Sequence, residues 1–231
     1  MIRIIYKDTD ICVISKPSGV ITNNAETSGE NTVQNWLSSE FKLDLVGKVG
    51  EFYEKGGIVH RLDKDTSGVM VLALNESAYE GLKKQFMERT AKKTYLALAH
   101  GKMKEESGLI SLPIERHSKN KHKFGIGTDL SRMAITEWKL LKQWKDYFLV
   151  EMYPHTGRTH QLRVHLKHFN HPIVSDPIYG GKSFKEDIKW CPRLFLHAKK
   201  LIISHPNTGE KMEFVDELPQ ELNEVMSKLV D

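Results

Sequence analysis

Apolar and polar residues alternate over several short runs of this chain, which is the pattern of strands with one buried face. The first two runs, residues 2–6 and 11–15, are separated by the turn-prone sequence KDTD and predict an N-terminal β-hairpin. Further strands are predicted by the runs at 69–74, 93–101, 108–117, 131–141, 147–154 and 193–204. Strands therefore dominate the middle of the chain.

Apolar residues at helical spacing mark four other segments. Residues 31–41 start with Asn31 as a cap and have a glutamine three positions later, and residues 75–89 start with a second asparagine. Helices are also predicted over 159–169 and over 219–230, which begins at a proline. The glycine-rich segment 47–57 is expected to be a loop. This order of elements predicts an α+β fold with a mixed, mainly antiparallel sheet and flanking helices.

A length of 231 residues is enough for a substantial core, and no linker or low-complexity tract divides the chain. We therefore expect a single domain over residues 1–231. No apolar run approaches the roughly 20 residues that cross a bilayer, and charges interrupt the first residues too early for a signal peptide. The expected protein is cytoplasmic and has no membrane partner.

Cysteine usage and charge narrow the function classes further. Cys12 and Cys191 are far apart and show no paired spacing, so neither a disulfide framework nor a cysteine zinc site is predicted. The net charge is +4, and cations gather in three runs at 92–95, 116–123 and 157–168. A single basic run is usually just a solvated part of the surface. With three such runs, a surface that binds phosphate groups is as good an interpretation as a solvated one.

The segment HRLDKDTSG, residues 60–68, places Asp63 and Asp65 among His60, Arg61 and Lys64. Its Asp-x-Asp-x-Thr pattern also occurs in magnesium-dependent phosphatases whose first aspartate is the nucleophile. Those enzymes carry that aspartate directly after a buried parallel strand, a context that this chain does not present convincingly. The two carboxylates could instead cap a turn before the strand at 69–74, and local sequence alone favours that structural role.

Five histidines between positions 155 and 171 raise the possibility of a metal site. No two of them have the i, i+4 spacing that places two imidazoles on one helix face, and no cysteine or carboxylate cluster accompanies them. We therefore expect no metal, and we expect the histidines beside the arginines of this segment to contact phosphate or to pack within the fold.

Taken together, the motifs resemble one enzyme family over nearly the whole chain. HRLDKDTSGVMVLA resembles the central motif of the RluA-type pseudouridine synthases, which isomerise selected uridines in ribosomal or transfer RNA. The similarity extends to IIYKDTDICVISKPSGV, KKTYLALAHG, PHTGRTHQLRVHL, HPIVSDPIYGG and LFLHAKKLIISHPNTGE. Ser175, where the family commonly has glycine, and FVDELP before the last helix depart from the pattern. We expect no N-terminal ribosomal-protein-like RNA-binding module, so substrate choice would come from the catalytic domain.

The resemblance implies the pseudouridine synthase fold with a central active-site cleft, no cofactor, and a monomer that acts on a stem-loop of ribosomal or transfer RNA. It implies Asp63 as the catalytic carboxylate, and attack on the sugar, attack on the base and electrostatic assistance of glycal formation all stay open. By family match, Arg163 is the expected partner that keeps Asp63 ionised, with Arg158 as the alternative. Tyr95 is expected to stack on the uracil and to take part in proton transfer.

The expected RNA contacts are cationic and come from all three basic runs and the central motif. They are His60, Arg61, Lys93, Lys119, Lys121, Lys123, Arg158 and His160. Arg61 is also expected to fill the space that a flipped base leaves, and Asp65 to shape the turn. A non-catalytic RNA-binding protein is the remaining alternative, because it would need these cations but would not need Asp63.

Overall fold

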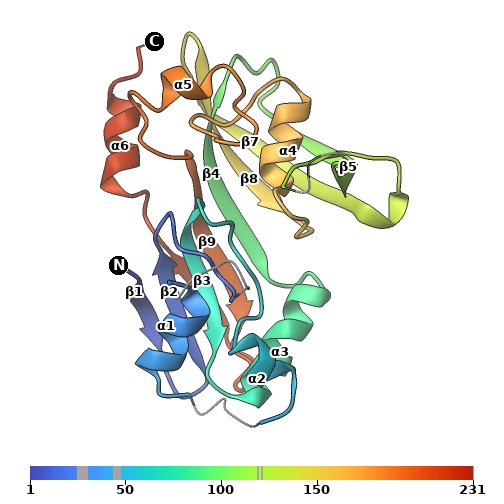
Figure 1. Cartoon of the computed structure of the whole chain (residues 1–231), viewed down its shortest axis with the longest axis vertical. Coiled ribbons are helices and arrows are strands. Elements are labelled where there is room, and N and C mark those ends of the chain that lie inside the picture. The colour runs from blue at the N-terminus through green and yellow to red at the C-terminus, as the bar shows by residue number, and fades with distance from the viewer. Residues whose placement is uncertain (25–30, 44–47, 119, 121, 231) are drawn as a thin grey trace. The chain divides into compact units, whose positions relative to one another are not determined.

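The computed structural model describes residues 1–24, 31–43, 48–118, 120 and 122–230 (Figure 1). The chain folds into two compact units. Unit 1 consists of Met1–Lys92 and Ala198–Glu217, and unit 2 consists of Lys93–His197 and Leu218–Asp231. The chain thus passes between the units three times. The single domain expected over residues 1–231 stays a prediction.

The strands of unit 1 form a sheet whose neighbours are in the order β1-β2-β3-β9, with β10 on the other edge of β9. Their bounds are Arg3–Lys7 for β1, Ile11–Lys16 for β2, Ser67–Ala73 for β3, Leu196–Ser204 for β9 and Lys211–Val215 for β10. The predicted N-terminal hairpin is confirmed, with an irregularity between Ile4 and Tyr6. Strand β10 lies where the sequence pattern predicted no element.

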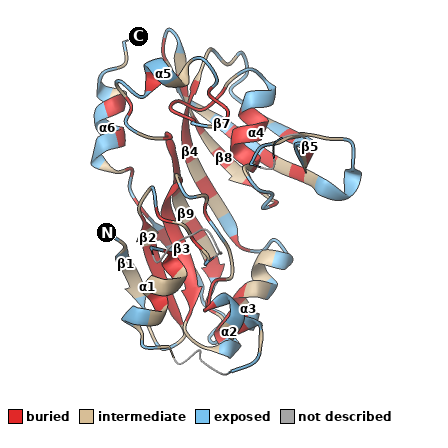
Figure 2. Cartoon of the chain, in the orientation of Figure 1, coloured by how far each residue is buried: buried red, intermediate tan, exposed pale blue. Residues whose placement is uncertain are grey.

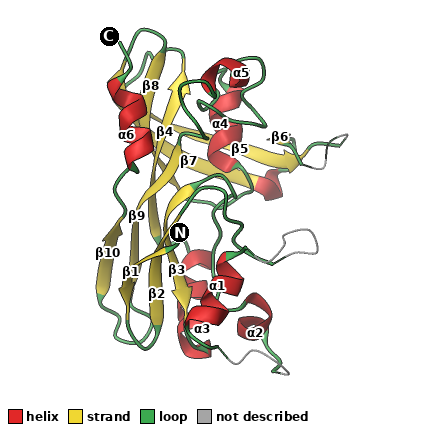
Figure 3. Cartoon of the chain, turned by 60° about the vertical axis from the view of Figure 1, so that its left-hand side comes forward, coloured by secondary structure: helices red, strands yellow, loops and turns green. Residues whose placement is uncertain are grey.

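The core of unit 1 is built on β2 and β3, which pair antiparallel from Ile11 opposite Ala73 to Lys16 opposite Gly68. Nearly every residue of both strands is buried (Figure 2), so the two strands have apolar side chains on both faces. Figure 3 shows three helices together on one side of these strands. They are α1 (Val33–Glu40), α2 (Glu51–Lys55) and α3 (Glu76–Met87).

Two expectations about these helices need correction. Helix α1 is capped by Thr32 and not by Asn31, because the Thr32 hydroxyl accepts the backbone N–H of Asn35 at 3.0 Å. Helix α2 forms inside the segment that was expected to be only a loop, and it ends at Gly56 in the left-handed conformation that favours glycine. The predicted cap of α3 is confirmed, since Asn75 Oδ1 accepts the backbone N–H of Ala78 at 2.9 Å.

Gly68 allows a close approach between two strands of the unit 1 sheet. Its φ is +125°, and a Cβ there would lie 2.2 Å from the carbonyl oxygen of Ala198 in β9. Only glycine lets the start of β3 approach the neighbouring strand this closely. The end of the HRLDKDTSG segment is therefore fixed against the middle of the unit 1 sheet.

The strands of unit 2 follow the order β4-β8-β7-β5-β6, and each neighbouring pair is antiparallel. Their bounds are Lys92–His100 for β4, Tyr147–Pro154 for β8, Met133–Gln143 for β7, Ser107–Arg116 for β5 and Phe124–Ile126 for β6. The predicted α+β class with a mainly antiparallel sheet is confirmed. Strand β6, which has three residues, was not predicted.

The helices of unit 2 are α4 (Gln161–His168), α5 (Phe184–Asp187) and α6 (Gln220–Ser227), preceded by the 3-10 turn Leu130–Arg132. Helices α4 and α6 confirm two sequence predictions, and α5 is additional. One core cluster joins strand residues such as Leu98 and Phe148 to Leu166 of α4 and Leu222 of α6. Through the described parts of the chain, no helix has the length and apolar character needed to span a membrane.

Candidate active site

Asp63 lies in unit 1, on a loop that leads into β3, and it is partly exposed. The loop is held through its backbone carbonyls, which accept hydrogen bonds from the last residue of β2 and from the segment after it. Thr22 Oγ1 donates to the carbonyl of Leu62 at 2.8 Å, and Ser18 Oγ donates to that of Asp65 at 2.8 Å. The carbonyl of Lys64 accepts two bonds, from the backbone N–H of Gly19 at 2.8 Å and from Lys16 Nζ at 3.1 Å. These bonds to backbone carbonyls fix the segment of the chain that carries Asp63.

Lys16 provides part of that anchor and was not singled out by the sequence analysis. It is fully buried at the end of β2, and its ammonium donates to the carbonyls of Pro17 (2.9 Å), Val20 (2.8 Å) and Lys64 (3.1 Å). A lysine has three N–H donors, so these three acceptors satisfy all of them. The sequence contained a signal for this role of Lys16: the lysine ends an apolar strand and directly precedes a proline. At such a position the long side chain of a lysine can reach the backbone carbonyls of the following turn.

The neighbours of Asp63 in the motif occupy different environments. Arg61 is exposed. The ring of His60 stacks on Phe86 at 4.4 Å between centroids, and its Nε2 accepts the backbone N–H of Val71 at 3.1 Å. The ring proton of His60 is therefore on Nδ1 and the imidazole is neutral in this arrangement. Contact of His60 and Arg61 with RNA stays a prediction.

The position of Asp63 argues against the phosphatase alternative. Asp63 precedes β3, whereas the nucleophilic aspartate of such phosphatases directly follows a buried parallel strand. The pairing of β3 with β2 is also antiparallel. The backbone N–H of Thr66 donates to the carbonyl of Asp63 at 3.1 Å, so the turn expected around Asp65 is present and is closed by a backbone hydrogen bond.

Arg163, in the first turn of α4 in unit 2, forms a buried ion pair that the sequence analysis missed. Its Nε donates to Asp176 Oδ2 at 2.8 Å and its Nη2 to Asp176 Oδ1 at 2.7 Å, while both side chains are at most 2% exposed. This two-point geometry is the strongest form of the arginine–carboxylate pair. Arg163 therefore has a fixed guanidinium, and its expected interaction with Asp63 stays a prediction.

Asp176 also organises the turn that follows it. Its Oδ1 accepts the backbone N–H groups of Ile178 and Tyr179, each at 2.9 Å. The signal for this residue was in the sequence, because an aspartate before a proline is typical of such a side-chain-to-backbone turn. What the sequence could not show is that the partner of this carboxylate is an arginine 13 positions earlier.

Gln161 holds the segment that joins β8 to α4. Its Oε1 accepts from Thr156 Oγ1 at 2.7 Å and from the backbone N–H of Arg158 at 3.0 Å. Its Nε2 donates to the carbonyl of Ile135 at 3.0 Å and to Thr136 Oγ1 at 2.9 Å. All four hydrogen-bonding positions of this buried amide are used. The loop of residues 155–160 is therefore fixed to strand β7.

Arg158 and His160, two of the expected RNA contacts, flank this anchor. Arg158 is exposed, and its Nη2 donates to the carbonyl of Ser131 at 3.1 Å. His160 precedes α4 in a left-handed conformation, with φ +56°, and its Nδ1 lies 2.9 Å from the Tyr179 hydroxyl. The structure thus brings His160 and Arg163 to the same end of one helix.

Tyr95 and Lys93 lie two positions apart on β4 and hence share one face of the unit 2 sheet. Tyr95 is partly buried and pairs opposite Met152 of β8. Burial lowers the pKa of Lys93 to about 8, and its Nζ donates to the carbonyl of Thr156 at 3.4 Å. In the described part of the chain no carboxylate forms an ion pair with Lys93.

The basic run at 116–123 connects β5 to β6. Lys119 and Lys121 lie outside the described residues. Lys123 is exposed, and its carbonyl accepts the backbone N–H of His117 at 2.9 Å. The Arg116 guanidinium lies 5.3 Å from the centre of the Phe124 ring at the start of β6. The described part of this hairpin therefore presents cations next to an aromatic ring.

Two histidines of the segment 155–171 have separate contacts within the fold. His165 is fully buried in α4, where burial lowers the pKa of its imidazole to about 4, and its Nδ1 lies 3.0 Å from Thr136 Oγ1. His171 Nδ1 lies 2.8 Å from the carbonyl of His100. These two imidazoles have structural partners, which the sequence spacing alone could not reveal.

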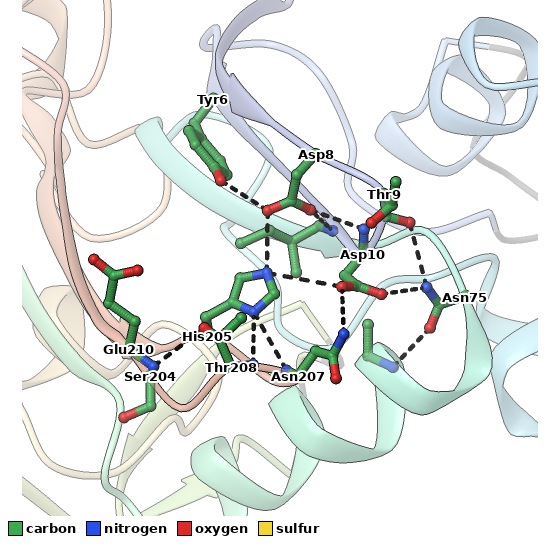
Figure 4. Close-up of polar contacts among 12 residues, drawn as sticks. Tyr6, Asp8, Thr9, Asp10, Asn75, Ser204, His205, Asn207, Thr208 and Glu210 are labelled. Atoms are coloured by element: carbon green, nitrogen blue, oxygen red, sulfur yellow. Dashed lines mark hydrogen bonds and ion pairs between the residues drawn. The ribbon is translucent and has the colours of Figure 1, made fainter.

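A different set of side chains, Asp8, Asp10 and His205 of unit 1, has ligand atoms within 4.8 Å of one another (Figure 4). His205 Nδ1 accepts the backbone N–H groups of Asn207 and Thr208, at 3.3 and 3.2 Å, so its proton is on Nε2. That nitrogen lies 3.0 Å from Asp8 Oδ2 and donates to it. Neither ring nitrogen has a lone pair left for a metal ion in this arrangement.

Asp8 is satisfied in the same network. Its Oδ1 accepts the backbone N–H groups of Asp10 and Ile11, and its Oδ2 accepts the Tyr6 hydroxyl, all at 2.8 Å. Burial alone would raise the pKa of the Asp8 carboxyl, but these hydrogen bonds and the nearby His205 outweigh it and leave the pKa below its ordinary value. The network joins the β1–β2 turn to the β9–β10 turn and is structural.

The comparisons with known proteins agree with these features. The family model described as "RNA pseudouridylate synthase" matches residues 10–168. The chain is 37% identical to "Uncharacterized RNA pseudouridine synthase YlyB" of Bacillus subtilis, over 98% of this chain and 72% of that protein. It is 38% identical to "Ribosomal large subunit pseudouridine synthase D" of Borreliella burgdorferi, over 95% of this chain and 66% of that protein.

A solved structure extends the similarity to the fold. The structure titled "Human RNA Pseudouridylate Synthase Domain Containing 1" aligns with a TM-score of 0.75 and 30% identity, over 95% of this chain and 84% of that one. The matched family segment includes the loop of Asp63, the face of β4 that carries Tyr95, and Arg163 of α4. The chain belongs to the RNA pseudouridylate synthase family and is an isomerase that acts on RNA.

Proposed function

We propose that this protein converts specific uridines of ribosomal or transfer RNA to pseudouridine, with Asp63 as the catalytic carboxylate. The observation that carries the proposal is the HRLDKDTSG motif within the matched family segment, on a loop whose backbone is fixed by Lys16, Ser18 and Thr22. The relative from Borreliella burgdorferi is named for the ribosomal large subunit, so ribosomal RNA is the first substrate to test. Such a substrate would place the protein in the cytoplasm.

The reaction breaks the bond between C1′ of the ribose and N1 of uracil, turns the base and forms a bond from C1′ to C5. The hydrogen of C5 leaves as a proton and N1 gains one, so the reaction has no net redox change and needs no energy source or cofactor. The base must leave its stack to be turned, which requires cations along the backbone and a flat surface for the base. Tyr95 supplies the aromatic ring in this proposal.

Asp63 must be ionised in each of the three possible routes, whether it attacks the sugar, attacks the base or stabilises charge during glycal formation. Arg163 is the proposed cationic partner, and its pair with Asp176 supports this role by fixing the position of the guanidinium. The proposed RNA contacts are His60, Arg61, Lys93, Lys119, Lys121, Lys123, Arg158 and His160. We propose that the protein acts as a monomer and without a metal ion.

The direct test is to map pseudouridines in ribosomal and transfer RNA from cells with and without the protein. We expect one or a few uridines to lose the modification and to regain it when purified protein is added to the unmodified RNA. A protein that binds these RNAs but leaves every uridine unchanged in both experiments would be an RNA-binding protein of this fold, and the proposal would be wrong.

Replacing Tyr95 by phenylalanine keeps the ring that stacks on uracil and removes only the hydroxyl. If the tyrosine takes part in proton transfer, this variant binds RNA with normal affinity and turns over at least about tenfold more slowly. The Tyr95→Ala protein should lose affinity as well. Single-turnover kinetics with binding measurements separates the two effects, and equal turnover by the Tyr95→Phe and wild-type proteins would restrict the residue to stacking.

Lys93 should make RNA affinity depend on pH near neutrality. With a pKa of about 8, the lysine is charged in most molecules at pH 7 and in a minority at about pH 8.5. If a phosphate binds only the charged form, affinity falls by about fourfold between these two pH values. Lys93→Arg stays charged and should remove this dependence, while Lys93→Met should bind weakly at both. Persistence of the full pH effect in the Lys93→Arg protein would assign it to another group.

A further inference from the structure

Tyr179 touches three separate parts of unit 2. Tyr179 lies in the turn after Asp176 and is only 7% exposed. The centre of its ring lies 5.2 Å from the central carbon of the Arg163 guanidinium. Its hydroxyl accepts the backbone N–H of Phe124 at 2.9 Å and lies 2.9 Å from His160 Nδ1. One buried side chain thus connects strand β6, the residue that precedes α4 and the first turn of α4.

The hydroxyl side of Tyr179 holds the basic hairpin. Strand β6 has only three residues and pairs with β5 at Ile114–Ile126, Glu115–Gly125 and Arg116–Phe124. A strand this short has little stability of its own. The hydrogen bond from its first residue, Phe124, to the buried Tyr179 hydroxyl is therefore a substantial part of what holds β6 in place. The same end of the hairpin carries the exposed cations Arg116, His117 and Lys123.

The ring side of Tyr179 belongs to the buried ion pair. Asp176 Oδ1 accepts both the Arg163 Nη2 proton and the backbone N–H of Tyr179, so one carboxylate oxygen fixes the arginine and the tyrosine together. A guanidinium next to an aromatic ring is also attracted to it electrostatically. Any displacement of the Tyr179 ring would therefore remove one of the surfaces that define where the Arg163 guanidinium lies.

We propose that Tyr179 is a positioning residue with two separable roles: its hydroxyl sets the described ends of the β5–β6 hairpin, residues 116–118 and 122–124, against α4 for RNA binding, and its ring fixes Arg163 for the reaction. This inference rests on the proposed function and adds to it a residue that touches neither RNA nor the reacting atoms. His160 connects the two parts of the molecule involved. Its imidazole contacts the Tyr179 hydroxyl, and its left-handed backbone directly precedes α4, the helix that carries Arg163.

Two substitutions separate the roles. Tyr179→Phe keeps the ring beside Arg163 but removes the hydroxyl, so KM for RNA should rise by about 2- to 10-fold while kcat changes by less than about twofold. The salt dependence of RNA affinity should also become shallower, because fewer cations of the hairpin reach phosphates. Tyr179→Leu removes ring and hydroxyl, so kcat should fall as well, by at least about tenfold.

The substrate for these measurements is an in vitro transcript of large-subunit ribosomal RNA, and binding is measured with the same transcript. Tyr153→Phe is the matched control, because its hydroxyl donates to Glu151 at 2.6 Å and it lies on the face of β8 opposite to that of Met152, the partner of Tyr95. This control should leave KM, kcat and the salt slope unchanged.

A purely structural role for Tyr179 predicts a lower melting temperature with unchanged KM, kcat and salt slope for the folded protein, and that result would overturn the inference. So would an equal loss of kcat in Tyr179→Phe and Tyr179→Leu. If the wild-type protein forms no pseudouridine in any RNA, the proposed function fails first. The hydroxyl role is then still tested by RNA affinity and its salt slope in the Tyr179→Phe and Tyr153→Phe proteins.

Discussion

The Asp63→Asn protein is expected to form no detectable pseudouridine and to melt within about 4 °C of the wild-type protein. Asparagine keeps the size of the side chain and one acceptor oxygen but removes the charge that each possible route requires. The loop should survive the change, because its bonds to Lys16, Ser18, Gly19 and Thr22 use backbone carbonyls rather than the Asp63 carboxylate. Mass mapping of a modified transcript, with thermal melts as a folding control, measures both quantities.

Asp65→Asn is the matched control for this experiment. It makes the same chemical change two positions away, at a residue whose carbonyl already holds the turn through Ser18. We expect this variant to retain activity. Appreciable turnover by Asp63→Asn would contradict the catalytic role of Asp63, and unfolding of that variant would instead indicate that the carboxylate serves the turn.

Arg163→Met is expected to cost about 3–5 kcal/mol of unfolding free energy, the largest effect on stability of any substitution considered for this chain. The change leaves Asp176, which is fully buried, with only the backbone N–H groups of Ile178 and Tyr179 as donors. A buried carboxylate without its cation is costly because it has lost water and gained no equivalent partner. Denaturant unfolding of the wild-type and variant proteins measures the loss.

The double variant Arg163→Met/Asp176→Asn separates stability from catalysis. Asparagine still offers Oδ1 to both backbone donors but carries no charge, so a substantial part of the lost stability should return. Turnover should not return, because the cation proposed to keep Asp63 ionised is still absent. If turnover and stability recovered together, the role of Arg163 would be limited to folding.

Local sequence patterns predicted the elements whose residues interact mainly with near neighbours. The N-terminal hairpin and the Asn75 cap are of this kind. The strands of unit 2 were predicted from their own alternation, although Tyr95 of β4 pairs with Met152 of β8, 57 positions later. Strands β6 and β10 escaped prediction because they are short, with three and five residues, and so show little alternation of their own; each is defined by pairing with the strand before it, β5 or β9, and β6 also by Tyr179. At α1 the pattern was off by one position, because Asn31 and Thr32 are both good caps and the choice is made by the hydroxyl that meets Asn35.

For the candidate site, the motifs identified the residue types but not their partners. Arg163 could be singled out from HQLRVHL, yet its ion pair with Asp176 arises only when α4 and the 176–179 turn fold together. Lys93 was expected on an exposed basic surface and is instead partly buried, which is what lowers its pKa. Burial is a property of the tertiary structure, so no charge pattern in the sequence could have given the ionisation behaviour of this lysine.

The passage of the chain between its two units has a consequence for its synthesis. Strand β3 ends at Ala73, but its sheet neighbour β9 begins at Leu196, so 122 residues are translated between them. At about 5–20 residues per second this interval lasts about 6–24 seconds. Throughout it, the nascent chain carries an apolar strand with one unpaired edge, the kind of edge that recruits other chains. The nascent chain is therefore exposed to aggregation on the ribosome during this interval, and a chaperone bound there would protect the open edge of β3.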